Sequence, residues 1–148
     1  MDIADFLTQD RIVLDARPRD KTLLLTEAAR LVARAVPALR QVAVEQALLG
    51  REQLGSTGLG GGFALPHARV DGLSSWLGLF LRLARPIEFA AIAAKPVALV
   101  FVLLIPAETS SHVSALAAIS RKFRDKALVA KLRAADGTGT VWGLLTGP

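Results

Sequence analysis

Apolar residues recur at helical spacing in two stretches of the first third of the chain. The first stretch predicts a helix over residues 21–35, which begins after the N-cap Asp20 and ends before Pro37. The second stretch predicts a helix over residues 42–52. The apolar positions expected to face the core are Leu24, Ala28, Leu31, Val32, Val44, Ala47 and Leu48.

Four other apolar segments have the lengths and patterns of β-strands. One lies around residues 12–14, and an alternating segment covers residues 76–84. Residues 97–105 are apolar without interruption, which is typical of a central strand with both faces buried. The segment "FALP", residues 63–66, predicts a short strand that its proline ends.

The last third of the chain again has the pattern of helices. We expect a helix soon after the central strand, with Ser110 or Ser111 as its cap. Residues 124–137 continue or restart this helix, and Gly137 ends it. Residues 139–145 predict a last short helix. Strands mixed with helices predict an α/β fold, in which one domain of residues 1–148 has helices flanking a mixed parallel and antiparallel sheet.

The composition excludes several kinds of site. The chain has no cysteine and only two histidines, so disulfides and thiolate chemistry are excluded and a metal site is not expected. The most apolar run, residues 97–106, is about half as long as the ~20 residues of a membrane-spanning helix. The acidic N-terminal segment lacks the apolar core of a signal peptide. We therefore expect a cytoplasmic protein that needs no cofactor and does not insert into a membrane.

The positive charge is concentrated in the second half of the chain. Residues 1–72 hold nine acidic and nine basic residues, whereas residues 73–148 hold four acidic and nine basic ones, and the net charge is +5. A basic half can attract nucleic acid or an acidic protein, although a solvated helix face is the more common explanation. Because the chain has no tyrosine and few aromatic residues, no nucleic-acid partner is expected.

A glycine-rich loop precedes a histidine. Five of the twelve glycines lie in residues 55–62, and His67 follows. These glycines follow a predicted helix and open a strand, and Phe63 comes next, so the pattern fits neither a Walker A loop nor a dinucleotide fingerprint. Two explanations remain, namely a loose surface connection and a loop whose backbone N–H groups approach an anion.

The positions of the two histidines favour an anion site. His67 lies just past a predicted strand, and His112 lies just past the central strand, in the first turn of a predicted helix. If these strands are parallel, both histidines lie at the edge of the sheet where α/β proteins bind ligands. Arg51, at the end of the second helix, adds a permanent positive charge near the start of the loop.

These donors suit a phosphoryl group. A neutral imidazole nitrogen, such as one of His67, is a nucleophile that can hold phosphorus in a P–N bond. Loop donors can stabilise the charge on the equatorial oxygens during transfer. The candidates are the hydroxyl groups of Ser56 and Thr57 and the backbone of Gly58. A single histidine at a strand end is more often a packing residue, and only the combination favours function. The sequence leaves open which imidazole nitrogen reacts.

The segment "RE-x-LGSTGLG-x-G-x-A-x-PHAR", residues 51–69, resembles the active-site signature of EIIA components of the bacterial phosphoenolpyruvate:sugar phosphotransferase system. The similar branch is the fructose/mannitol/nitrogen-regulatory one. The resemblance implies that His67 is phosphorylated by an HPr-like phosphocarrier. It also implies that His112 assists without being phosphorylated and that Arg51 lies beside the phosphate. Gly61, where the family often has asparagine, is a departure, as are Ala93 and Ala94 in place of an Asp-Gly turn.

The C-terminal segment and the lack of an attached EIIB or EIIC segment resemble the stand-alone nitrogen-regulatory EIIA. This resemblance implies binding to regulatory targets according to phosphorylation state. One alternative is a fructose-type EIIA that passes phosphate to an EIIB in sugar uptake, and another is a binding module that has lost phosphotransfer. We expect the carrier to dock on Leu59 and Phe63, whereas Leu65 is expected to be a core residue.

Overall fold

The computed structural model describes residues 1–89, 95–109 and 113–148. Its strands are β1 (Ile12–Ala16), β2 (Gly58–Gly60), β3 (Phe63–Ala64), β4 (His67–Val70), β5 (Leu77–Ile87) and β6 (Val97–Pro106). Its α-helices are α1 (Lys21–Ala35), α2 (Gln41–Leu54), α3 (Val113–Arg124), α4 (Lys126–Ala134) and α5 (Thr138–Thr146). Two short 3-10 helices, η1 (Ile3–Asp5) and η2 (Gln9–Arg11), precede β1.

The six strands of the described residues form one mixed sheet in the order β1-β5-β6-β3-β2, with β4 also paired to β6. The β1–β5, β3–β6 and β4–β6 pairs are parallel, whereas β5–β6 and β2–β3 are antiparallel. This arrangement confirms the predicted α/β fold with a mixed sheet.

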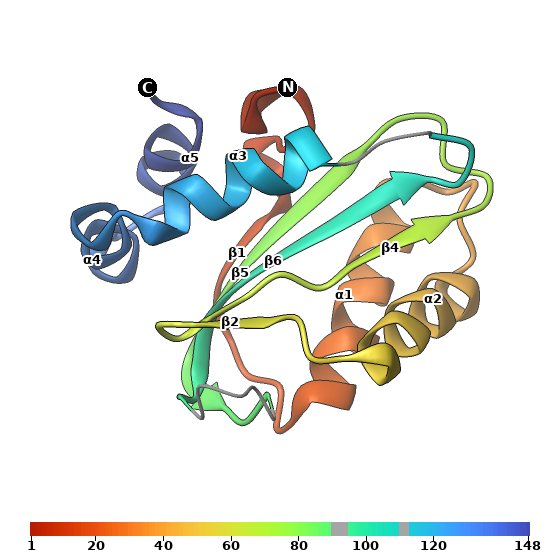
Figure 1. Cartoon of the computed structure of the whole chain (residues 1–148), viewed down its shortest axis with the longest axis horizontal. Coiled ribbons are helices and arrows are strands. Elements are labelled where there is room, and N and C mark those ends of the chain that lie inside the picture. The colour runs from red at the N-terminus through yellow and green to blue at the C-terminus, as the bar shows by residue number, and fades with distance from the viewer. Residues whose placement is uncertain (90–94, 110–112) are drawn as a thin grey trace.

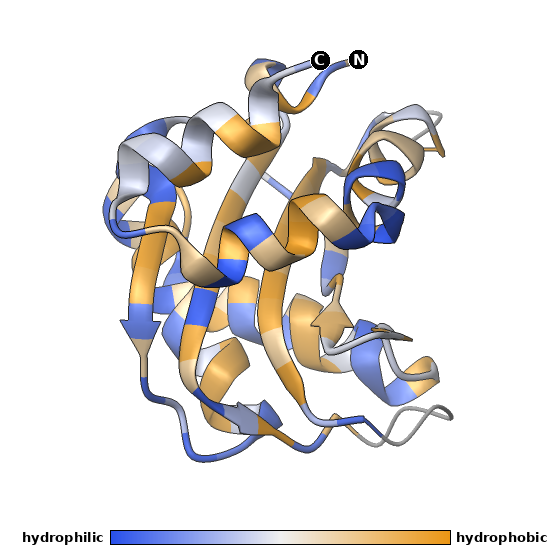
Figure 2. Cartoon of the chain, turned by 90° about the vertical axis from the view of Figure 1, so that its left-hand side faces the viewer, coloured by the Kyte–Doolittle hydropathy of each residue, from blue (hydrophilic) through white to orange (hydrophobic). Residues whose placement is uncertain are grey.

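Helices cover both faces of the sheet, with α1 and α2 on one face and α3, α4 and α5 on the other (Figure 1). The side chains of β6 alternate between the two resulting cores. Val100, Val102 and Leu104 pack toward α1 and α2, whereas Phe101 and Leu103 pack toward the other helices. Both faces of β6 are therefore buried, which explains its unbroken apolar sequence (Figure 2).

Local signals set several boundaries as predicted. Helix α1 covers the expected residues, and the carboxylate of Asp20 accepts a hydrogen bond from the N–H of Leu23 at 2.8 Å. Helix α2 begins one residue before and ends two residues after the predicted range 42–52. None of the helices in the described ranges has the combined length and apolar character of a membrane-spanning segment.

Two boundaries differ from the predictions. Strand β5 continues through Ile87 instead of ending at Ala84, with a shift in its register with β6. The C-terminal helical stretch restarts after Asp125, whose carboxylate caps α4, which is one of the two predicted possibilities. Helix α4 ends at Ala134, and Gly137 is the N-cap of α5 rather than the end of the preceding helix. The predicted capping serines lie outside the described residues.

The short strand before His67 also differs from the prediction. It ends at Ala64 instead of Pro66, and His67, which was expected to lie just past this strand, is the first residue of a further strand, β4. His67 is in register with Leu103 of β6. The chain remains alongside β6 across Pro66, since the carbonyl oxygen of Pro66 accepts a hydrogen bond from the N–H of Leu103 at 2.9 Å. Both β3 and β4 run parallel to β6, which is the condition for a site at this edge of the sheet.

Candidate functional site

The glycine-rich loop is an ordered hairpin rather than a loose connection. Strand β2 pairs with β3, so that Gly58 lies opposite Ala64. Gly60, Gly61 and Gly62 have φ angles of 84°, 63° and 81°. Residues with a Cβ atom rarely adopt positive φ, so this turn needs its three consecutive glycines.

Backbone hydrogen bonds connect the hairpin to His67. The N–H of Leu65 donates to the carbonyl oxygen of Thr57 at 2.9 Å. The carbonyl oxygen of Leu65 lies 2.7 Å from Nδ1 of the half-buried His67 ring. Because a carbonyl oxygen only accepts hydrogen bonds, Nδ1 carries the proton, and the lone pair of the neutral ring is on Nε2. The structure therefore distinguishes the two nitrogens that the sequence left open.

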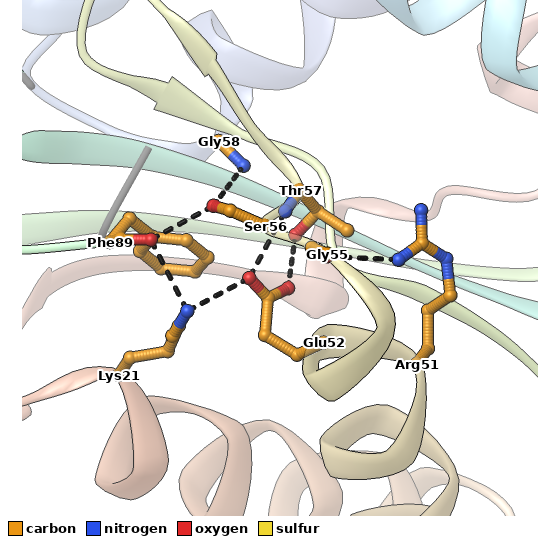
Figure 3. Close-up of polar contacts among 8 residues, drawn as sticks. All are labelled: Lys21, Arg51, Glu52, Gly55, Ser56, Thr57, Gly58 and Phe89. Atoms are coloured by element: carbon orange, nitrogen blue, oxygen red, sulfur yellow. Dashed lines mark hydrogen bonds and ion pairs between the residues drawn. The ribbon is translucent and has the colours of Figure 1, made fainter. Parts of the chain in front are cut away.

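Arg51 lies at the start of the loop, as predicted. Its Nη1 donates to the carbonyl oxygen of Gly55 at 3.0 Å (Figure 3). This bond holds a permanently charged guanidinium group at the junction between α2 and the hairpin.

His112 lies outside the described residues, so its predicted proximity to His67 stays a prediction. Residues 107–109, which come before His112 in the sequence, are hydrogen-bonded to β4. Arg69, two residues after His67, donates to the carbonyl oxygens of Ala107, at 3.3 Å, and Thr109. Thr109 precedes His112 by three residues in the sequence. These bonds place the end of β6 and the segment after it beside the strand that begins with His67.

The hydroxyl groups predicted to approach an anion form hydrogen bonds to other groups of the protein in this structure. Ser56 donates to the carbonyl oxygen of Phe89 at 2.8 Å and accepts from the N–H of Gly58 at 3.1 Å (Figure 3). Thr57 is only 3% exposed, and its N–H and hydroxyl both donate to the carboxylate of Glu52, at 3.0 and 2.5 Å. The prediction for Thr57 is therefore wrong, because both of its donors are buried and already bind the carboxylate of Glu52.

A buried carboxylate beneath the loop was not predicted from the sequence. Glu52 is buried, and its carboxylate lies 3.0 Å from Nζ of Lys21. The same ammonium group donates to the carbonyl oxygen of Phe89 at 3.2 Å and lies 5.1 Å from the centre of the Phe89 ring (Figure 3). The spacing of Val44, Leu48 and Glu52, four residues apart, was the available signal, because it continues the buried stripe of α2.

The two predicted docking residues have different environments. Leu59 in β2 is 55% exposed, which leaves its side chain available to a partner. Phe63 is 4% exposed, and its ring stacks on Phe123 of α3 with centroids 3.7 Å apart. The expectation that Phe63 is reachable is therefore wrong, because the helical layer covers this face of β3. Leu65 is buried, as the core interpretation expected.

Comparison with known proteins shows the family. Residues 5–147 match the family described as "Phosphoenolpyruvate-dependent sugar phosphotransferase system, EIIA 2". The chain belongs to the EIIA 2 family. Within this family, it is 37% identical over 149 aligned residues to a nitrogen regulatory protein of Bradyrhizobium diazoefficiens, with 100% of this chain and 97% of the relative covered.

Solved structures agree with this assignment. The crystal structure of the nitrogen regulatory protein IIA-Ntr from Neisseria meningitidis superposes with a TM-score of 0.92 at 37% identity, covering 97% of this chain and 99% of that one. The mannitol IIA of Escherichia coli, in a complex with phosphorylated mannitol IIB, shares the fold. Its TM-score is 0.80 at 20% identity, with coverage of 96% and 98%. The chain is thus an EIIA-type domain that resembles nitrogen-regulatory members, and phosphotransfer through a phosphohistidine is general in this family.

Proposed function

We propose that His67 accepts a phosphoryl group from an HPr-like phosphocarrier, and that the protein ends a nitrogen-regulatory phosphorelay in the cytoplasm. The observation that carries this proposal is the contact between Nδ1 of His67 and the carbonyl oxygen of Leu65. It orients the ring and leaves the lone pair of the neutral imidazole on Nε2, which is the form required of a nucleophile.

In the proposed reaction, Nε2 forms a bond to phosphorus while the bond between phosphorus and the carrier breaks, and that electron pair leaves with the carrier. The imidazole ring gains positive charge as the P–N bond forms. The Nδ1–H group carries part of this charge, so its hydrogen bond to Leu65 becomes stronger during transfer. The backbone of Leu65 therefore acts on the reacting ring in addition to holding its orientation.

Arg51 supplies the positive charge in this proposal. Its guanidinium group is held at Gly55, and it would balance the charge on the phosphoryl oxygens. The negative charge of Glu52 does not oppose this, because Lys21 and both donors of Thr57 already bind its carboxylate. Ser56 and Gly58 remain candidate phosphate donors. To bind the phosphate, the hydroxyl group of Ser56 would give up its hydrogen bond to the carbonyl oxygen of Phe89, and the N–H of Gly58 would give up its hydrogen bond to Ser56. His112 is proposed to assist without being phosphorylated.

The likeness to nitrogen regulatory proteins supports a regulatory role, in which regulatory protein targets bind according to phosphorylation state. A phosphoryl group adds up to about two negative charges, so a target that faces His67 would sense a changed surface potential. The second candidate function is transfer from His67 to an EIIB, as the complex of mannitol IIA with phosphorylated IIB suggests for a protein with this fold.

The test is incubation with phosphoenolpyruvate, enzyme I and an HPr-type carrier, followed by intact mass. We expect one acid-labile phosphoryl group, which His67→Ala abolishes. Arg51→Ala and His112→Ala should fold normally and accept phosphate roughly 10²–10³ times more slowly, the usual effect of losing one such donor. Label that persists in the His67 variant would overturn the proposal. Rapid transfer to an added fructose-type EIIB would favour the transport role.

A further inference from the structure

The tripeptide Ala-Arg-Pro occurs twice in the chain, at residues 16–18 and 84–86. The two copies lie side by side, because β1 and β5 are parallel neighbours in which Ala16 pairs with Leu83. Both strands therefore bring an arginine and a proline to one end of the sheet. The carboxyl ends of parallel strands are where α/β proteins commonly bind ligands.

This end of the sheet is far from His67. Ile87 of β5 pairs with Val97 at the start of β6, whereas His67 pairs with Leu103, six residues further along β6. At about 3.3 Å per residue, the two positions are roughly 20 Å apart along the strand. A ligand at the paired tripeptides would occupy a site separate from the phosphoryl site.

A pocket of about 370 Å³ lies between the two tripeptides. We call it the arginine pocket, and its lining residues are Arg17, Pro18, Arg19, Arg85, Pro86 and Ile87. Half of these residues are arginines and none is acidic. The volume is within the range of roughly 300–1,000 Å³ that is usual for small-molecule sites.

The charges in the arginine pocket are mostly unbalanced. Arg17 forms an exposed ion pair with Asp15 at 3.0 Å. Over residues 1–89, 95–109 and 113–148, the side chains of Arg19 and Arg85 form no hydrogen bond or ion pair. The carboxylate of the adjacent Asp20 caps α1 through the N–H of Leu23. Two guanidinium groups are therefore available to a ligand, and their mutual repulsion favours binding of a negative charge.

The backbone around the arginine pocket is held in place. Proline has a fixed φ angle, and Pro18 and Pro86 follow the arginines of both tripeptides. The register of β1 with β5 shifts between Val13 and Ala16, and Asp15 there has a φ angle of 62°. Such a conformation is uncommon for a residue other than glycine and is found more often near functional sites.

We propose that the arginine pocket binds a small oxyanion with two or more negative charges, such as an organic phosphate or a polycarboxylate. Guanidinium groups match these ligands because their N–H donors pair in parallel with two oxygens of a phosphate or carboxylate. This site does not depend on the phosphoryl chemistry of His67, so either proposal can fail while the other holds.

The test is an NMR titration of the full chain with pyrophosphate and, separately, with citrate, against sodium chloride of matched ionic strength. We expect saturable shifts of the amide signals of Arg17, Arg19, Arg85 and Ile87. Saturation by pyrophosphate alone would identify a phosphate site, and saturation by both anions would identify a general oxyanion site. Failure of both to saturate would overturn the proposal.

Variants distinguish the arginine pocket from other anion sites. The double substitution Arg19→Gln and Arg85→Gln should weaken binding at least tenfold without changing the fold, since neither side chain forms a bond within the described residues. Arg34→Gln is the matched control, because Arg34 is an exposed arginine at the opposite end of α1. His67→Ala should also leave binding unchanged. Equal losses in the double variant and the Arg34 control, or shifts confined to residues 55–67, would contradict the proposal.

Discussion

Nδ1 of His67 lies 2.7 Å from the carbonyl oxygen of Leu65. This contact requires a proton on Nδ1 and predicts that phosphate attaches to Nε2. Nitrogen-15 NMR of the phosphorylated protein, labelled in its histidine rings, distinguishes the two isomers by the coupling of each ring nitrogen to phosphorus. Phosphate on Nδ1 would show that the ring turns before it reacts and would remove Leu65 from the mechanism.

The Glu52 carboxylate should contribute much more to stability than a surface carboxylate. Glu52→Ala leaves the donors of Thr57 and the charge of Lys21 without their partner, so the free energy of unfolding should fall by about 3 kcal/mol. Glu27→Ala is the control, because Glu27 pairs with Arg30 at the surface and should contribute less than about 1 kcal/mol. Urea unfolding measures both. Equal losses would show that the buried network does not hold the loop.

Leu59 should contact the phosphocarrier. Leu59→Glu places a charge on an exposed apolar position of β2, and we expect a higher Michaelis constant for the carrier with an unchanged melting temperature. Val42→Glu provides the matched control, since Val42 is 56% exposed at the start of α2, at the other end of the helix that leads to the loop. If both variants have the wild-type Michaelis constant for the carrier, Leu59 does not contact the carrier.

The turn of the hairpin should tolerate a Cβ atom at one glycine better than at the next. A Cβ atom on Gly62 would lie 2.7 Å from Nη2 of Arg133, whereas one on Gly61 meets no atom within 4 Å. Gly61→Ala should lower stability by about 1 kcal/mol, from its positive φ alone. Gly62→Ala should cost more, because Arg133 must move away from its hydrogen bond to Gly61. Urea unfolding of the two variants measures the difference, and equal stabilities would show that Arg133 moves without cost.

The features that depend on neighbours in the sequence were predictable. Helix α1 and its Asp20 cap follow from apolar spacing and a local hydrogen bond, and the central position of β6 follows from its unbroken apolar run. The motif around His67 and Arg51 likewise indicated the family by itself, because it is a contiguous pattern of residue types.

Only the tertiary structure decided how distant segments meet. Nothing local shows that Lys21 binds Glu52, that α3 covers Phe63, or that the arginines of two Ala-Arg-Pro copies line one pocket. The partner of a polar or aromatic side chain depends on strand order and register, which are set by the packing of the whole sheet. The sequence by itself thus determined the elements and the chemistry carried by the motif. The structure also decided which nitrogen of the neutral His67 ring holds the lone pair, because the carbonyl oxygen of Leu65 lies against Nδ1. Although Leu65 and His67 are close in the sequence, the path of the chain between them is set by the pairing of both β3 and β4 with β6.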